Sequence, residues 1–329
     1  MRAFEYVRAT DTQEVVRKLA EDPSASCLAG GTTQLDLMKD GVLEPPTLID
    51  ITRLPLHGIE RRGEALHVGA LATMEELAAD ATVAERLPVV RESLLMGASV
   101  QLRNMATIGG NLLQRTRCRY FRDPTVLECN KRAPGTGCAA VLGAARMHAV
   151  LGANENCIAL HASDLAVALV ALDAVVHIHG PSGRRSVPLT DFYITADESP
   201  ERENVLEHAE LITEVEIPLP PPSARSGYLK VRDRMSYEFA LTSAAVVLVI
   251  EEGTIRQARI GLGGVGTKPW RAYEAEHVLT GAPATSATFR DASEATMRDA
   301  WTVPGTAFKV PLARRTLVRE LQTVSGVTA

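Results

Sequence analysis

The sequence lacks any apolar run of the roughly 18 residues that a membrane-spanning helix requires. Its longest apolar stretches, residues 165–171 and 244–250, have the lengths of a buried helix and a buried strand. It also lacks an excess of basic residues, because 35 Lys and Arg residues stand against 40 Asp and Glu residues. We therefore expect no membrane span and no nucleic acid as a general partner.

Two further patterns are missing. No unit recurs with a period of about 20 to 50 residues, which argues against a repeat architecture. The first residues, Met-Arg-Ala-Phe-Glu-Tyr-Val-Arg, do not show the charged-then-apolar order of an export signal. We expect a cytoplasmic chain, or a periplasmic one if it is exported together with a signal-bearing partner.

What is present is an ordinary globular composition over 329 residues, with 46% hydrophobic and 23% charged residues. A chain of this length is expected to form two or three domains. The proline cluster at residues 218–222 continues neither a strand nor a helix, so it predicts a domain boundary.

Strand and helix patterns alternate along the first half of the chain. Asp11-x-x-Glu14 and Thr73-x-x-Glu76 each predict a capping box that opens a helix, and Ser163 or Asp164 is expected to cap another. The predicted strands are residues 4–7, 25–28, 47–51, 66–68 and 175–178. The predicted helices cover residues from 12 onward, 35–39, from 73 onward, 88–96 and up to 172.

The region after the proline cluster is predicted to contain a hairpin, residues 243–250 and 254–262, and helices near 271–279 and 308–322. Within the preceding region, His177 and His179 lie on one face of the strand at 175–178. Because no third ligand lies in step with them, we interpret both as solvent-side strand residues rather than metal ligands.

Two glycine-containing loops stand at predicted helix starts. Ala29-Gly30-Gly31-Thr32-Thr33 offers backbone N–H groups to a phosphate, although it is neither a Gly-x-Gly-x-x-Gly nor a Gly-Lys-Ser/Thr loop, and alone a tight turn explains it better. Thr107-Ile108-Gly109-Gly110-Asn111 is a second such loop. If the two loops face each other, they are suited to hold a pyrophosphate from both sides.

Four of the five cysteines, Cys118, Cys129, Cys138 and Cys157, fall within one stretch, separated by ten, eight and eighteen residues. No Cys-x2-4-Cys pair is present, which weakens a zinc knuckle and favours an iron–sulfur cluster. Structural zinc, disulfides and unrelated thiols remain alternatives. Cys27 stands apart and is expected to be a buried, small apolar thiol.

The surroundings of the four cysteines are also informative. Arg and Lys residues crowd the stretch and are expected to favour thiolates. The backbone N–H groups of Gly135 and Gly137 are expected to donate to cluster sulfurs.

Four segments, residues 28–35, 107–111, 163–165 and 214–218, together resemble the FAD-binding medium subunit of the xanthine dehydrogenase/carbon monoxide dehydrogenase family of molybdenum hydroxylases. They occur in the family's order over nearly the whole chain. The resemblance implies an α+β fold, with a two-part FAD-binding domain of the p-cresol methylhydroxylase/vanillyl-alcohol oxidase type and a smaller α+β C-terminal domain. The implied parts are residues 1–55, residues 56–219 with an iron–sulfur insert at 115–158, and residues 223–329.

The cysteine stretch departs from most of the family. It resembles the cluster-bearing subset, the FAD subunits of bacterial periplasmic-type aldehyde oxidoreductases and of 4-hydroxybenzoyl-CoA reductase. This resemblance implies that Cys118, Cys129, Cys138 and Cys157 ligate one 4Fe-4S cluster. The compact sequence at residues 130–138 favours the aldehyde oxidoreductase branch.

The resemblance also implies an FAD site. Residues of the first loop would hold the pyrophosphate, and residues of the second would close over it. Asp164 would meet the adenine end, Lys230 would lie near the flavin ring, and Ile212 would form an apolar wall; the alternative for Lys230 is a solvated strand lysine. The implied loop residues are Ala29, Gly30, Gly31, Thr32, Thr33, Gln34 and Leu35 on one side, and Thr107, Gly110 and Asn111 on the other.

The function implied is an oxidoreductase subunit, active only in a complex, that passes electrons from a molybdenum site to an external acceptor through FAD. A small subunit with 2Fe-2S clusters and a large subunit with the molybdopterin cofactor would complete a heterotrimer, or a dimer of heterotrimers. No residue of this chain is expected to be catalytic. Two alternatives stay open, a 4-hydroxybenzoyl-CoA reductase-like subunit with reversed electron flow and a non-catalytic, zinc-stabilised assembly subunit.

Overall fold

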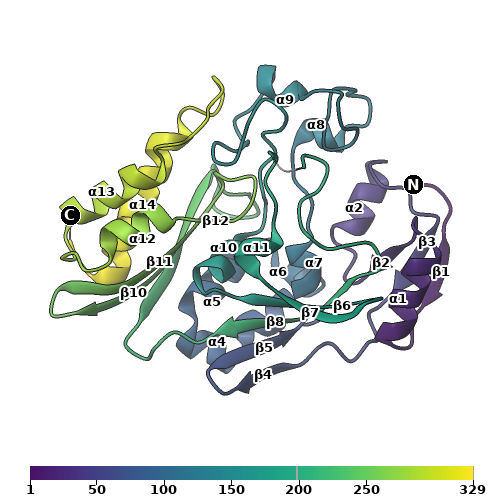
Figure 1. The fold of residues 1–329 in the computed structure, drawn as a ribbon, viewed down its shortest axis with the longest axis horizontal. Coiled ribbons are helices and arrows are strands. Elements are labelled where there is room, and N and C mark those ends of the chain that lie inside the picture. Colours follow the sequence, from purple (N-terminus) through teal and green to yellow (C-terminus); the bar gives the residue numbers. More distant parts are fainter. Residues whose placement is uncertain (198, 329) are drawn as a thin grey trace.

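The computed structural model describes residues 1–197 and 199–328, and its strands form three sheets (Figure 1). Each sheet is built mainly from a different part of the chain. Helices pack on all three sheets, so the fold is of the predicted α+β class. No helix among the described residues is long and apolar enough to span a bilayer.

The first sheet is small and parallel. Its strands, in spatial order, are β1 (Glu5–Arg8), β3 (Thr47–Asp50) and β2 (Ser26–Leu28), and its helices are α1 (Thr12–Glu21) and α2 (Gln34–Lys39). Asp11 caps α1 by accepting a hydrogen bond from Glu14 N at 2.8 Å. The predicted capping box is only half correct, because the Glu14 carboxylate accepts from Thr10 N at 2.8 Å instead of from Asp11 N.

The second sheet is antiparallel and carries helices against its buried face. Its strands, in spatial order, are β4 (Ile59–Arg62), β5 (Ala65–Gly69), β8 (Leu211–Pro218), β6 (Val175–Gly180) and β7 (Gly183–Pro188). The helices are α3 (Met74–Ala79), α4 (Ala81–Arg86), α5 (Pro88–Met96), α6 (Val100–Arg103), α7 (Ile108–Leu112), α10 (Asp164–Ala171) and α11 (Leu189–Phe192). Because side chains alternate along a strand, Val176 and Val215 are buried while their strand neighbours His177, Glu214 and Glu216 are only partly buried.

The third sheet is antiparallel and belongs to the C-terminal part. Its strands, in spatial order, are β12 (Trp270–Arg271), β11 (Thr254–Gly263), β10 (Thr242–Glu251) and β9 (Arg225–Val231). Three helices, α12 (Tyr273–Leu279), α13 (Ser286–Thr296) and α14 (Lys309–Ser325), accompany it.

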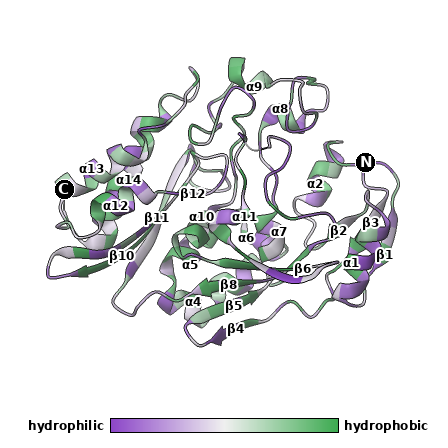
Figure 2. Cartoon of the chain, viewed as in Figure 1, coloured by the Kyte–Doolittle hydropathy of each residue, from purple (hydrophilic) through white to green (hydrophobic). Residues whose placement is uncertain are grey.

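Helix α10 joins the second and third sheets. It contacts β10 and β11 as well as α5 and α7, and it is hydrophobic along its length in Figure 2. The approach to β11 is close, because a Cβ atom at Gly261 would lie 2.2 Å from the carbonyl oxygen of Val167. The two parts of the chain therefore share one packed helix.

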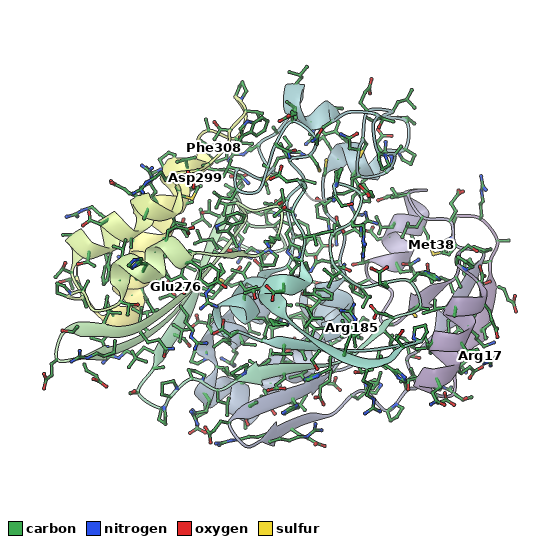
Figure 3. All side chains as sticks on the ribbon, viewed as in Figure 1. Arg17, Met38, Arg185, Glu276, Asp299 and Phe308 are labelled. Carbon is green, nitrogen blue, oxygen red and sulfur yellow. The ribbon has the colours of Figure 1, made fainter. Side chains whose placement is uncertain are left out.

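The residues between α7 and α10 form a lobe with two short helices, α8 (Arg119–Arg122) and α9 (Ala139–Leu142), and this lobe includes the segment 115–158 that was predicted as an insert (Figure 1). Arg122 ties this lobe to α2, since its Nη1 lies 2.6 Å from Asp36 Oδ2 and 3.1 Å from Asp40 Oδ2. On the other side, the Arg146 guanidinium lies 4.8 Å from the ring centre of Phe308. Phe308, labelled in Figure 3, immediately precedes α14. The lobe therefore contacts both the N-terminal and the C-terminal part.

Candidate functional site

The two glycine loops face each other across a cleft with two arms. The first arm is a cavity of about 220 Å³ that includes Gly30, Thr107 and Ile212 in its wall. The second arm is a cavity of about 200 Å³ that includes Asn111 and Lys230. Because Thr32, Thr33 and Gly110 line both cavities, the arms meet between the loops.

Close backbone contact brings the loops together. A Cβ atom at Gly30 would lie 1.7 Å from the carbonyl oxygen of Met105, so only glycine fits this position. Gly31 has a φ of +72°, which side-chain-bearing residues rarely adopt. On the second loop, Thr107 caps α7 by accepting a hydrogen bond from Gly110 N at 3.2 Å. The glycines of the first loop and the capping threonine of the second are therefore the residues that allow the two loops to lie in contact.

The described residues leave polar groups at the cleft that suit an anionic, extended ligand. Gln34 Nε2 is buried without a hydrogen-bond partner among them, and Gln34 lines the first arm. The Thr32 and Thr33 side chains line the junction of the arms. An orphaned donor beside two threonines and glycine backbone fits a pyrophosphate with sugar hydroxyls.

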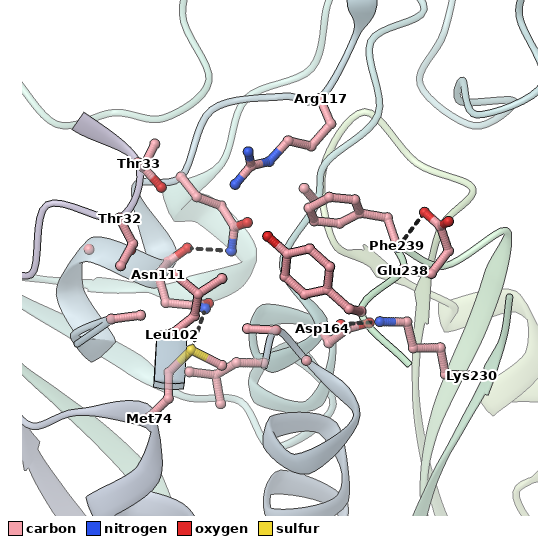
Figure 4. A pocket seen from close by; sticks show the side chains of 18 of the residues that line it. Thr32, Thr33, Met74, Leu102, Asn111, Arg117, Asp164, Lys230, Glu238 and Phe239 are labelled. Atoms are coloured by element: carbon pink, nitrogen blue, oxygen red, sulfur yellow. Dashed lines mark hydrogen bonds and ion pairs between the residues drawn. The ribbon is translucent and has the colours of Figure 1, made fainter. Parts of the chain in front are cut away.

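The second arm contains a buried ion pair, shown in Figure 4. Lys230 Nζ lies 2.7 Å from Asp164 Oδ2 and donates to Met96 O at 3.1 Å. The Lys230 side chain is only 1% exposed, so the alternative of a solvated strand lysine is wrong. Tyr228 Oη donates to Asp164 Oδ1 at 2.6 Å, which fixes the carboxylate.

This ion pair corrects one implied role. Asp164 was expected at the adenine end and Lys230 near the flavin ring, but groups 2.7 Å apart cannot contact opposite ends of an extended dinucleotide. Ile212 lies in the other arm, beside Cys27 and Leu211. The arms therefore separate Ile212 from the Asp164–Lys230 pair.

Every remaining residue implied for the site lies at the cleft or supports it. Ala29, Gly31 and Gln34 join Gly30 and Thr107 in the first arm. Leu35 supports the first loop from below, since its N–H donates to Gly31 O at 3.0 Å and its side chain packs beneath Gly31.

Sequence reasoning missed several residues of the second arm. Arg117 and Phe239 both line it, and the Arg117 guanidinium lies 5.0 Å from the Phe239 ring centre (Figure 4). Both residues also line a neighbouring cavity that includes Cys118. No motif signals them, because 122 positions of sequence separate the two side chains.

The four clustered cysteines converge in the lobe, and all five cysteines of the chain are free thiols. Cys129 and Cys138 pair across an isolated β-bridge, and Cys157 lies within electrostatic reach of both. Cys118 likewise interacts with Cys129 and Cys157. The structure therefore brings together thiols from four separate positions of the lobe, without a disulfide among them.

At Cys118 and Cys157, burial opposes the expected thiolate form. Burial raises the pKa of the Cys118 thiol to about 11, and burial also raises the pKa of Cys157 even though the Lys131 charge acts in the opposite direction. The nearby cations already have anionic partners: Arg122 is paired with Asp36, and Lys131 lies 3.4 Å from Glu203. Metal loading must therefore displace thiol protons.

Two other details of the lobe differ from expectation. The N–H of Gly137 donates to Asn130 Oδ1 at 2.8 Å, so it does not point to a sulfur. Instead, Ala159 N donates to Cys157 Sγ at 3.4 Å. His148, which no sequence pattern signalled, places Nε2 3.2 Å from Cys118 Sγ, and burial lowers its pKa to about 4.

His177 is a strand residue on the outer side of the sheet, as expected, but ligand groups from neighbouring strands lie close to it. His177 belongs to a group with His67 and Glu214 in which the ligand atoms all lie within 4.8 Å of one another. These residues come from three strands, so the single-strand pattern did not reveal the group. His179 is half-buried on the same strand and is not a member.

Comparison with known proteins places this geometry in context. The family described as FAD binding domain in molybdopterin dehydrogenase matches residues 2–220, and the family described as CO dehydrogenase flavoprotein C-terminal domain matches residues 227–323. The aldehyde oxidoreductase FAD-binding subunit PaoB of Escherichia coli (strain K12) is 45% identical over 324 residues, 98% of each chain.

More distant relatives share the same architecture. The carbon monoxide dehydrogenase medium chain of Afipia carboxidovorans is 30% identical over 283 residues, covering 85% of this chain and 80% of that protein. The solved structure of a Cu,Mo-CO dehydrogenase in its cyanide-inactivated form superposes with a TM-score of 0.78 at 25% identity, covering 99% of this chain and 98% of that one.

Proposed function

The chain belongs to the FAD-binding subunits of the molybdopterin dehydrogenase family, which includes the carbon monoxide dehydrogenase medium chains, and we propose that it is the FAD and iron–sulfur electron-transfer subunit of a molybdenum-dependent aldehyde oxidoreductase. The observation that carries this proposal is the two-armed cleft whose second arm adjoins the cavity beside Cys118. A redox ligand in the cleft and a metal group on the thiols would be neighbours. FAD, when bound, supplies the chemistry that joins two-electron and one-electron transfers.

Different residues of the cleft are proposed to hold different parts of FAD. Gly30, Gly31, Thr32, Thr33 and Gly110 surround the junction of the arms, where backbone N–H groups and hydroxyls suit a pyrophosphate. We assign the flavin ring to the second arm, because that arm adjoins the cysteine lobe. The apolar first arm then receives the adenine.

Within this arrangement the Asp164–Lys230 pair serves the flavin end. The buried ion pair would place a fixed dipole with no net charge beside the flavin ring, and Asp164 holds the Lys230 ammonium group, a hydrogen-bond donor, in place. Ile212 packs at the adenine end. The remaining proposed FAD contacts are Ala29, Gln34, Leu35, Thr107 and Asn111.

The thiols Cys118, Cys129, Cys138 and Cys157 are proposed to ligate a 4Fe-4S cluster. The spacing in the sequence supports a cluster rather than zinc, because the four cysteines are separated by ten, eight and eighteen residues and form no Cys-x2-4-Cys pair. Such a cluster supplies a one-electron station when present.

The partner subunits are inferred from the names of the related proteins. The names of the relatives describe a FAD-binding subunit and medium chains, which are parts of larger enzymes. We propose a small 2Fe-2S subunit and a large molybdenum subunit as partners, in a heterotrimer or a dimer of heterotrimers. The chain would contain parts at residues 1–55, 56–219 and 223–329, and it would leave the chemistry on the aldehyde to the large subunit.

The cluster assignment is tested by metal and flavin analysis of the chain after anaerobic purification. We expect about four irons and one FAD per chain, with much less iron after Cys118→Ser, Cys129→Ser, Cys138→Ser or Cys157→Ser. Cys27→Ser is the matched control, because Cys27 lies in β2 outside the lobe, and it should leave the iron content unchanged. About one zinc with no iron would show instead that the thiols hold a structural zinc.

A further inference from the structure

A group of potential metal ligands lies on the outer face of the second sheet, away from the cleft. His67 on β5, Glu214 on β8 and His177 on β6 present ligand atoms that are all within 4.8 Å of one another. The helices α5 and α7 belong to the buried side of this sheet. Val68, Val176 and Val215, which each neighbour one of the three residues along its strand, are buried on that side.

We propose that His67, His177 and Glu214 form a binding site for a divalent transition metal ion of the zinc class. Two imidazoles and one carboxylate are a ligand set typical of zinc sites that keep an open position. Imidazole ligands select zinc, copper and nickel over magnesium and calcium, which prefer sets of oxygen ligands.

Strand register produces the group. His177 is the direct cross-strand partner of Glu214, and His67 is the partner of Glu216. The register between β6 and β8 shifts immediately after His177, at a bulge of the kind that re-aims side chains. As a result His67 and His177 lean toward one carboxylate from both sides, with their rings stacked 6.4 Å apart at an angle of 19°.

Surrounding polar groups orient the ligand atoms inward. His67 Nδ1 lies 2.7 Å and His177 Nε2 lies 4.0 Å from the same oxygen, Glu214 Oε1. The other atoms are held elsewhere, because His177 Nδ1 lies 2.8 Å from Ser186 Oγ and Arg62 Nη1 lies 3.1 Å from Glu214 Oε2. The Ser186 contact fixes the orientation of the His177 ring. The Arg62 contact fixes the Glu214 carboxylate, although its positive charge opposes a bound cation.

The site has room for further ligands. A cavity of about 480 Å³ opens over His177 and Glu214, so solvent reaches the ion position. Glu216 Oε2 lies 3.1 Å from His177 Nε2 and is available as a fourth protein ligand. The hydrogen bonds that now link these groups place protons where the ion would sit, so binding releases protons.

The test is a titration of untagged, FAD- and iron-loaded full chain with zinc chloride by isothermal calorimetry, with zinc counted after dialysis. We expect one zinc per chain, and at least about tenfold weaker binding for His67→Ala and for Glu214→Gln. His179→Ala is the matched control on the same strand and should bind zinc as the wild type does. Circular dichroism of each variant confirms that the surface substitutions leave the fold intact.

Two further readouts separate a metal site from an ordinary hydrogen-bonded network. Zinc affinity should fall at least about tenfold between pH 7.5 and pH 5.5, because protons then compete for the imidazoles. An excess of magnesium should not displace the zinc. Wild-type zinc binding in both His67→Ala and Glu214→Gln, or no zinc bound at about 0.1 mM zinc and pH 7.5, overturns the proposal.

Discussion

At the residue scale, Gly30 decides whether the two loops of the cleft can meet. Its Cα lies so close to Met105 that an added Cβ would collide with the Met105 backbone carbonyl. A backbone carbonyl cannot move aside by changing rotamer, as a side chain can. We expect Gly30→Ala to cost about 3 kcal/mol of stability and to yield flavin-poor protein. The FAD-to-protein absorbance ratio of the purified chain measures this.

The matched control for Gly30 is Gly58→Ala, because the nearest atom to a Cβ there is Glu60 Oε1 at 3.7 Å, an ordinary contact. Gly58→Ala should retain flavin at the wild-type ratio. A full complement of FAD in Gly30→Ala would mean that the loops do not hold the dinucleotide as we assign it.

Glu320 on α14 predicts a pH dependence of stability. Burial, together with the nearby Glu92 charge, raises the pKa of Glu320 from 4.5 to about 8. Between these values the folded chain keeps a proton that the unfolded chain has lost, so stability falls as pH rises. Glu320→Gln removes this cost and should stabilise the chain by roughly 1 to 4 kcal/mol at pH 8.

The Glu320→Gln advantage should shrink steadily as the pH is lowered toward 5, where both folded and unfolded carboxyl groups hold more of their protons. Urea unfolding of both proteins at several pH values, followed by circular dichroism, measures the difference. An advantage that is equal at pH 5 and pH 8 would contradict a raised pKa at this site.

Site residues could be predicted only where a local sequence pattern indicates them. The two glycine loops stand out because their conformation depends on glycine itself, whereas Arg117, Phe239 and His148 matter only through neighbours that are distant in sequence. The ionisation of Cys118 was wrongly predicted for a related reason. Sequence shows how many arginines lie nearby but not which ones are already paired, nor how deeply the thiol is buried.

At the scale of elements, the start of α3 shows that short-range signals are sufficient for a helix end. Thr73 accepts a hydrogen bond from Glu76 N at 3.2 Å and Thr73 N donates to Glu76 Oε2 at 2.7 Å, as the capping-box pattern predicts. Thr73→Ala should lower stability by about 1 kcal/mol, since a cap is lost. Thermal unfolding measures this.

The conservative control is Thr73→Ser, which retains a hydroxyl at the cap and should unfold close to the wild-type temperature. Equal losses in the alanine and serine variants would show that the threonine methyl packing, and not the cap, stabilises this turn.

Helices and strands were predicted correctly where the residue pattern inside the element and the residues at its two ends indicate the same element. Helix α5 begins and ends as predicted, because Pro88 suits a first helical position and Gly97 follows the last. Strand β4, three of whose four residues are exposed, was not predicted because a solvated edge strand has no apolar alternation. The group formed by His67, His177 and Glu214 was missed for a different reason, since strand register cannot be obtained from one strand.

At the scale of the whole molecule, the cysteine lobe links the flavin-binding parts to the surface. Arg122 is only 13% exposed and is bound to Asp36, so its charge stabilises the chain itself. Arg119 is exposed, and Leu127 and Leu142 on the same lobe are 77% and 97% exposed. These residues are available to a partner subunit, which an electron-transfer protein requires.

The central claim is that this chain receives electrons from partner subunits and does not oxidise aldehydes itself. The most direct measurement is anaerobic addition of aldehyde to the isolated FAD-loaded chain and to the complex with its small and large partners, with the flavin absorbance followed over time. We predict that the flavin bleaches in the complex and stays oxidised in the isolated chain. Bleaching of the isolated chain with no molybdenum present, or an unreduced flavin in a complex that consumes the aldehyde, would contradict the account.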